Sequence, residues 1–137
     1  MPSSSIKGKS VVIIGGTAGI GLAAAQAAAA AGAKVWVAGR SESQIEKAKL
    51  AAQGAFEVRQ ADTHDAESLK ALFDEVGTID HLVSAAVGGE RTLKPFLEQT
   101  EEQFKAAYDK LWGYAKVVRT GAPYLAADGA VTLVSGS

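Results

Sequence analysis

The sequence predicts a doubly wound α/β fold, with three layers (α/β/α) built around a parallel sheet. Short apolar runs predict strands at 11–14, 35–38, 56–60, 79–83 and 130–134. Segments rich in helix-forming residues separate these runs, at 19–31, 41–52, 65–76 and 98–125. Strands that alternate with helices favour parallel pairing through right-handed crossovers. We therefore expect the strand order third, second, first, fourth, fifth, which reverses direction beside the first strand.

The stretch VVIIGGTAGIG, at 11–21, joins the first expected strand to the first expected helix. Gly15 would allow a sharp turn, Gly19 a close approach of the backbone to a pyrophosphate, and Gly21 close packing of the helix on the strand. Backbone N–H groups at a helix start bind phosphate. Three glycines can also serve only to end a strand and let a helix pack. Their position between a strand and a helix favours a nucleotide site.

Length and composition restrict the class of protein. The 137 residues suit one domain, and 14 basic against 15 acidic side chains give a formal net charge of −1. This balance argues against a nucleic-acid partner. The chain has no cysteine, and its two histidines, His64 and His81, stand far apart in the sequence, so we expect no metal site. No segment resembles a signal peptide or membrane span, and we expect a cytoplasmic protein with no membrane partner.

The end of the second expected strand bears on the choice of cofactor. Sites that bind NAD carry an acid about 20 residues beyond the glycines, where it holds the ribose 2′-hydroxyl. Here Gly39 has no side chain, and Arg40 offers a planar cation suited to a 2′-phosphate. Ser41 and Thr17 could add hydroxyl groups to the same phosphate. We therefore expect NADP (NADPH) rather than NAD; the alternative is that Arg40 is a solvated surface residue.

The glycine turn and the fourth expected strand resemble the short-chain dehydrogenase/reductase family. Residues 14–21 follow the family's TGxxxGIG pattern, with Ile14 in place of threonine. DHLVSAAVGG, at 80–89, is similar to its D-x-L-V-N-N-A-G segment, with Ser84 and Ala85 in place of the asparagines. The resemblance implies a Rossmann-type fold and hydride transfer between a nicotinamide and a small-molecule carbonyl or alcohol. It also implies cofactor contacts by Ile20 beside the glycines, by Asp62 and Thr63 at the adenine, and, through their backbone, by Ser84, Ala85 and Ala86 at the ribose. Asp62 would equally suit a plain turn.

The catalytic residues that this resemblance implies are incomplete. Lys110 stands where the family usually has an asparagine that holds a water of its proton relay, and its ammonium could still donate a hydrogen bond to such a water or to a main-chain carbonyl. The alternative is that Lys110 is a solvated helix residue. GAVTLVSGS, at 129–137, resembles the family's strand that ends in the catalytic serine. Strict alignment places Gly136 at that serine, so either Ser135 or Ser137 would have to serve. None of the three tyrosines has a lysine four residues later, as the family's Tyr-x-x-x-Lys pair requires.

The resemblance covers nearly the whole chain but only the cofactor-binding half of a typical family member. We expect 1–137 to form a single dinucleotide-binding domain that corresponds to the N-terminal part of a longer fold. Three functions stay open: an NADP(H)-dependent oxidoreductase, a catalytically incomplete nucleotide-binding or interaction module, and a truncated fragment of the enzyme.

The last helical segment, 98–125, carries one apolar face. Its members recur at spacings of three or four residues, at Phe104, Ala107, Tyr108, Leu111 and Ala115. This face predicts either packing in the core or, as in the family, a homo-oligomer interface.

Overall fold

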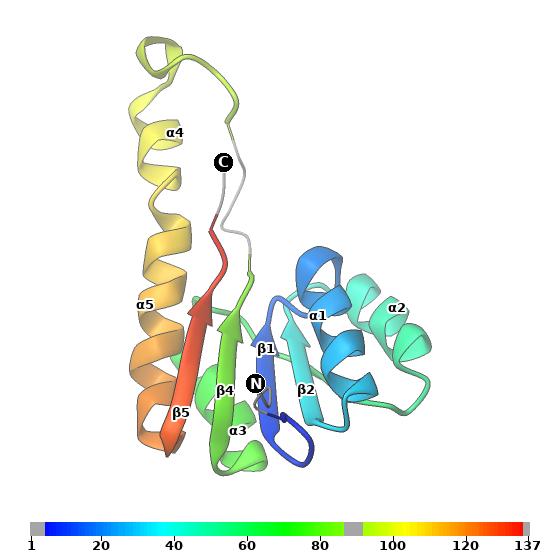
Figure 1. The fold of residues 1–137 in the computed structure, drawn as a ribbon. Coiled ribbons are helices and arrows are strands. Elements are labelled where there is room, and N and C mark those ends of the chain that lie inside the picture. The colour runs from blue at the N-terminus through cyan, green and yellow to red at the C-terminus, as the bar shows by residue number, and fades with distance from the viewer. Residues whose placement is uncertain (1–4, 87–91, 136–137) are drawn as a thin grey trace.

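The structure, a computed structural model, describes residues 5–86 and 92–135, which form three layers around a parallel sheet (Figure 1). The strands are β1 (Ser10–Ile14), β2 (Lys34–Gly39), β3 (Glu57–Gln60), β4 (Ile79–Ser84) and β5 (Leu125–Leu133). All of these strands pair in parallel, in the order β3-β2-β1-β4-β5. The expected fold class and strand order are therefore confirmed, and the order reverses between β1 and β4.

Helices cover both faces of the sheet. One face carries α1 (Gly19–Ala30) and α2 (Glu42–Ala52), and the other carries α3 (Ala66–Val76) and α5 (Asp109–Gly121). Alternate side chains of β1 serve the two layers. Val11 and Ile13 pack under α1 and α2, whereas Val12 and Ile14 pack in the core of the other face. β1 is thus buried on both faces, as its unbroken apolar run predicts.

The helical segment expected at 98–125 is divided. A 3₁₀ turn (Phe96–Glu98) precedes α4 (Glu101–Ala106), and α5 begins after a break at 107–108. At this break the amides of Ala107 and Tyr108 donate to carbonyl oxygens three residues earlier, at 3.3 and 3.0 Å, as in a 3₁₀ turn. β5 begins at Leu125 rather than near 130, because pairing with β4 extends the strand through a segment of low strand propensity.

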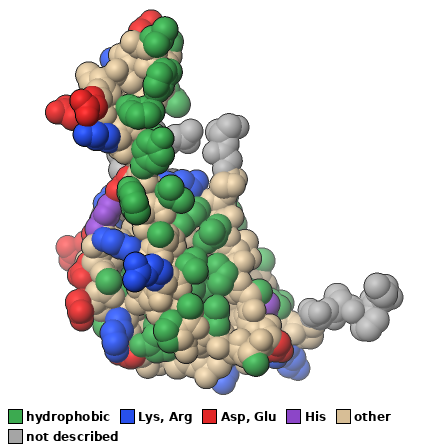
Figure 2. Space-filling model, turned by 90° about the vertical axis from the view of Figure 1, so that its left-hand side faces the viewer, with side chains coloured by type: hydrophobic (Ala, Val, Ile, Leu, Met, Phe, Trp, Pro, Cys, Tyr) green, Lys and Arg blue, Asp and Glu red, His purple; other side chains and the backbone are tan. Residues whose placement is uncertain are grey.

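α4 projects beyond the carboxyl ends of the strands (Figure 1). We call residues 93–112 the apolar arm, because they expose Leu93, Phe96, Leu97, Phe104, Tyr108, Leu111 and Trp112. The ring of Phe104 meets those of Phe96 and Tyr108 edge-on, with centroids 5.1 and 5.7 Å apart. Figure 2 shows hydrophobic side chains gathered along the arm and onto the body below. The apolar face expected in this segment therefore does not pack into the core.

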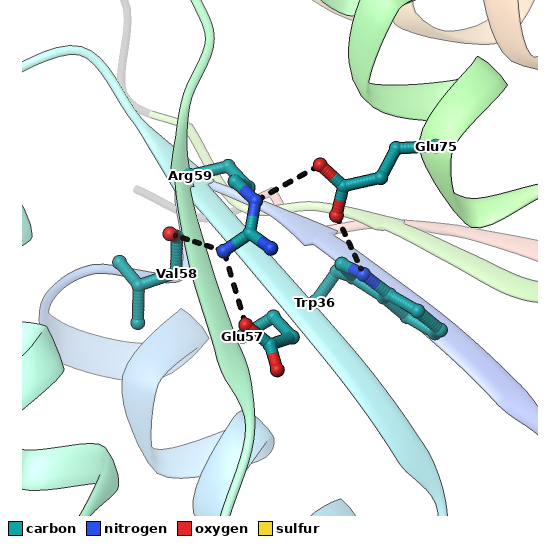
Figure 3. Close-up of polar contacts among 5 residues, drawn as sticks. All are labelled: Trp36, Glu57, Val58, Arg59 and Glu75. Atoms are coloured by element: carbon teal, nitrogen blue, oxygen red, sulfur yellow. Dashed lines mark hydrogen bonds and ion pairs between the residues drawn. The ribbon is translucent and has the colours of Figure 1, made fainter. Parts of the chain in front are cut away.

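A polar cluster ties α3 to the β2–β3 side of the sheet (Figure 3). Arg59 of β3 donates from Nε to Glu75 of α3 at 2.9 Å and from Nη1 to Glu57 at 3.1 Å. Trp36 Nε1 donates to the second oxygen of Glu75 at 3.2 Å. The hydrogen bond with Glu75 raises the pKa of Arg59 above its ordinary value. None of these side chains reaches the cleft at the end of the sheet, so the cluster is structural.

Candidate functional site

A cleft of about 550 Å³ lies at the carboxyl end of the sheet, where the strand order reverses. The segments that follow all five described strands line it, together with the starts of α1, α2 and α5. Parallel strands bring their carboxyl ends to one edge, which is why segments so far apart in the sequence meet here.

The cleft brings together most of the residues that the sequence identified. Those that line it are Gly15, Thr17, Gly19, Ile20, Gly21, Arg40, Ser41, Asp62, Thr63, Ala85, Ala86, Lys110 and Ser135. Ser137 lies outside the described residues. The roles of these side chains at a cofactor or substrate stay predictions.

Ser84 does not line the cleft. It is fully buried, and its Oγ makes no hydrogen bond with any described residue. Leu82 and Ser84, two residues apart in β4, point to the same face, where Leu82 packs in the core under α3 and α5. The carbonyl oxygen of Ser84 accepts from the amide of Val134, at 2.9 Å. Strand alternation thus turns the Ser84 side chain toward the helices, and only Ala85 and Ala86 continue into the cleft.

Each glycine of the turn has a separate geometric reason. Gly15 has φ +82°, and a Cβ there would lie 2.3 Å from the amide nitrogen of Ala86. Gly19 has φ +55°, and no atom lies within 4 Å of where its Cβ would be. A Cβ at Gly21 would lie 2.2 Å from the carbonyl oxygen of Gly15. Gly21 therefore allows the helix to pack on the turn itself, while Gly19 leaves its side of the cleft open.

The start of α1 suits a phosphate. Ala18 occupies the N-cap position without a side-chain hydrogen bond, and the first turn of the helix contains no acid. The first N–H groups of an α-helix have no partner within the helix, and the helix dipole favours an anion beside them. Ala18, Gly19 and Ile20 line the cleft, so this helix start opens to it. The residues present thus fit the diphosphate of a dinucleotide.

Arg40 and Ser41 lie at the end of β2, on another wall of the same cleft. Arg40 is exposed, and among the described residues no carboxylate pairs with its guanidinium. The hydroxyl of Ser41 accepts from the amide of Gln44 at 3.4 Å, and it lies 3.0 Å from the hydroxyl of Ser43. Ser41 therefore caps α2, while Arg40 remains available to an anion.

Asp62 performs a turn role at the end of β3. Its Oδ1 accepts from the amide of His64 at 2.9 Å, and its own amide donates to Ser68 Oγ at 3.0 Å. These bonds hold the 61–64 segment in place at the cleft. The other carboxylate oxygen makes no hydrogen bond within the described ranges, so an adenine contact by Asp62 stays a prediction.

Residues of α5 contact the same segment, 61–64, and help to hold it in place. The imidazole Nε2 of His64 lies 3.1 Å from the carboxylate of Asp109, and Lys116 Nζ donates to the carbonyl oxygen of His64 at 3.0 Å. Gly113 allows the helix to approach Thr63, whose Oγ1 would lie 3.1 Å from a Cβ at that position. His64 lines the cleft, which the sequence analysis missed. Its place two residues beyond Asp62, at a strand's carboxyl end, was the available signal.

Lys110 and Ser135 line the remaining side of the cleft. Lys110 Nζ lies 5.5 Å from the ring centroid of Tyr114. Tyr114 is buried, and its hydroxyl donates to the carbonyl oxygen of Val134. This bond holds the end of β5 against α5 and so positions Ser135. None of the three tyrosines, all of which are described, lines the cleft.

Residues 5–86 and 92–135 lack two other kinds of feature. No group of three or more His, Asp or Glu side chains in these ranges could hold a metal ion. No helix in them combines the length and the apolarity needed to cross a bilayer.

Comparison with known proteins identifies the family. The profile of the short chain dehydrogenase family matches residues 9–136. A 3-dehydrosphinganine reductase of Arabidopsis thaliana is 35% identical, over 89% of this chain and 38% of its own length. The 11-beta-hydroxysteroid dehydrogenase A of Sesamum indicum is 32% identical, over 98% of this chain and 41% of its own length. The chain therefore spans well under half the length of these curated relatives.

Solved structures agree on the fold. A short-chain type dehydrogenase/reductase from Mycobacterium ulcerans superposes with a TM-score of 0.86 at 22% identity, over 97% of this chain and 53% of that one. The MalC Reductase/Diels-Alderase of Malbranchea aurantiaca gives a TM-score of 0.80 at 27% identity, over 96% and 57%. Profile, sequence relatives and fold agree: the chain belongs to the short-chain dehydrogenase/reductase family, a family of oxidoreductases.

Proposed function

We propose that this chain binds NADP(H) and forms the cofactor-binding part of an oxidoreductase that moves hydride between the nicotinamide and a carbonyl or alcohol. One observation carries the proposal: the start of α1, which has no side-chain cap, and the guanidinium of Arg40, which pairs with no carboxylate among the described residues, open into the same cleft. The first suits a diphosphate and the second a 2′-phosphate. A cleft that served NAD would present an acid at the end of β2 instead.

The residues of this chain would bind and orient the cofactor, which itself supplies the hydride chemistry. Backbone N–H groups at 19–21 would hold the diphosphate, and Arg40 would hold the 2′-phosphate. Ala85 and Ala86, which bring only backbone and methyl groups to the cleft, would lie along the ribose. Lys110 and Ser135 are the polar side chains at the side of the cleft formed by α5 and the end of β5.

Titration of NADPH and NADH into the wild type and Arg40→Asp tests the cofactor proposal. A hydrogen bond to a charged group contributes about 1.5–3 kcal/mol, which is roughly a tenfold to hundredfold preference for NADPH. Arg40→Asp should remove this preference. Arg119→Asp changes the same charge on an exposed face of α5 outside the cleft and should leave both affinities unaltered. Equal affinities for the two cofactors in the wild type would remove Arg40 from this role.

We also propose that residues 1–137 alone bind dinucleotide without turning over a carbonyl substrate. General acid catalysis contributes on the order of 10²–10⁴ in rate and needs the acid within ~2.6–3.2 Å of its proton acceptor. No tyrosine reaches the cleft, and none carries the Tyr-x-x-x-Lys pattern. Orientation by the cofactor site alone would leave only residual hydride transfer.

NADPH oxidation by this chain and by a version extended along its natural reading frame separates the candidate functions. The substrate panel should hold aldehydes, ketones and quinones, and include 3-dehydrosphinganine because of the relative named above. Turnover only by the extended chain supports an oxidoreductase of which these residues are one part. Binding without turnover by either chain would favour a nucleotide-binding or interaction module. Comparable turnover by both would contradict the proposal and make Lys110→Met and Ser135→Ala the next variants.

The apolar arm supports a further proposal, that copies of the chain associate through it. Phe104, Tyr108 and Leu111 are 38%, 48% and 59% exposed, although they form one apolar face. Apolar surface gathered in one place on a chain often marks a protein interface.

A further inference from the structure

Thr17 fills the space beside Gly39. A Cβ at Gly39 would lie 2.4 Å from Thr17 Oγ1, 2.7 Å from its Cγ2 and 3.1 Å from its Cβ. A Cβ atom essentially never lies within 3.0 Å of a non-bonded heavy atom, so a side chain at position 39 would force Thr17 to shift. Thr17 itself is only 6% exposed. Its hydroxyl makes no hydrogen bond within the described part of the chain, and its low exposure shows that neighbouring atoms pack closely around this side chain.

The backbones on both sides of this contact are fixed. The amides of Gly15 and Gly16 donate to the carbonyl oxygen of Ala38, at 2.8 and 3.2 Å. The carbonyl oxygen of Gly39 accepts from the amide of Ala61, at 3.0 Å. The glycine turn and the end of β2 therefore cannot separate to make room without breaking hydrogen bonds.

We infer that Thr17 and Gly39 form a steric pair that sets the cofactor preference of this cleft: while Thr17 is present, no side chain fits at 39, and the acid that an NAD site needs there is excluded. The inference rests on the proposed dinucleotide function for its ligand, but its steric part concerns the protein alone. Arg40 attracts a 2′-phosphate, and Thr17 keeps out the carboxylate that would repel it. Arg40 and Thr17 thus both favour NADPH over NADH, Arg40 through its charge and Thr17 through its volume.

This pairing means that an acid at 39 is not sufficient to change the preference. Gly39→Asp alone would push Thr17 against the glycine turn, and it would weaken the site for both cofactors. The same acid combined with Thr17→Gly would have room beside the ribose.

The steric part is tested without any ligand, by thermal unfolding of Gly39→Ala in three backgrounds. Gly39 does not have a left-handed backbone, and alanine in place of glycine in a strand normally stabilises a protein. Crowding predicts the opposite sign in the wild type, a fall of roughly 3–10 °C in the unfolding midpoint. In Thr17→Gly the same change should be neutral or stabilising. In Thr17→Val, which keeps the volume and removes the hydroxyl, Gly39→Ala should lower the unfolding midpoint as much as it does in the wild type. A rise in the wild type, or an equal fall in all three backgrounds, would overturn the steric pair.

The cofactor part is tested by titrating NADH and NADPH into Gly39→Asp and Gly39→Asp/Thr17→Gly. The single variant should lose at least about tenfold in NADPH affinity with no gain for NADH, and the double variant should bind NADH at least about tenfold more tightly than the single one. An equal gain of NADH affinity in both variants would overturn the role of Thr17 in cofactor choice. If the wild type binds neither cofactor, the proposed function and this role fall together, whereas the unfolding measurements still decide the steric pair.

Discussion

Alanine at Gly15 and at Gly19 probes two positions of the glycine turn that share a positive φ but differ in surroundings. The values of φ are +82° and +55°. A left-handed backbone costs an L-residue roughly 1–2 kcal/mol, so both variants should lose stability. Only at Gly15 would the new Cβ also meet backbone, 2.3 Å from the nitrogen of Ala86 and 2.6 Å from the carbonyl carbon of Ala85. These atoms belong to the segment after β4 and cannot rotate away as a side chain would.

The two substitutions should therefore separate folding from binding. Overpacking adds about 1–3 kcal/mol to the backbone strain, so Gly15→Ala should lower the free energy of unfolding by about 2–5 kcal/mol. Gly19→Ala should lower it by only about 1–2 kcal/mol, since nothing lies near its Cβ. The Gly19 methyl would instead occupy the open cleft where the diphosphate approaches, and NADPH affinity should fall at least about tenfold.

Urea unfolding of the ligand-free proteins and NADPH titration measure the two effects independently. Gly8→Ala is the matched control, because Gly8 has φ +76°, has no atom within 4 Å of its Cβ position and does not line the cleft. It should lose about as much stability as Gly19→Ala and bind NADPH as the wild type does. Equal stability losses at Gly15 and Gly19 would refute the packing argument. Unaltered NADPH binding by Gly19→Ala would refute the placement of the diphosphate.

Two further predictions concern surfaces outside the cleft. Hydrogen bonds from Tyr124 and then Lys70 lower the pKa of Asp74, so this carboxylate stabilises the fold above about pH 4, and the contribution is lost as the pH falls through its lowered value. Asp74→Asn should therefore flatten the acid decline of the urea midpoint between about pH 5 and pH 3, and a profile that overlays the wild type would contradict this. On the apolar arm, Leu111→Glu should shift the sedimentation coefficient toward that of a monomer. Leu50→Glu, at a 77% exposed position of α2, should not, and a wild type that sediments as a monomer at all concentrations would exclude association through the arm.

The sequence was sufficient for the architecture because its signals are local and repeated. The apolar run at 11–14 can be satisfied only by burial on two faces, and the alternation with helices then implies parallel pairing through right-handed crossovers. The same logic predicted which residues gather at the cleft, since every segment concerned follows a strand and parallel strands end at one edge. Gly15 and Gly19, whose φ angles are positive, could therefore be identified from their spacing after the first strand.

Tertiary packing decided the rest. The early start of β5 depends on its pairing with β4, a contact that local composition does not contain. Ser84 turned away from the cleft because strand register, rather than proximity in the chain, decides which face a side chain takes. The fit of Thr17 beside Gly39 joins positions 22 residues apart, and it exists only because hydrogen bonds draw the glycine turn onto the end of β2. The spacing of residues along the chain determines where each strand and helix ends. The volume available to a side chain is determined instead by the segments that folding packs against it.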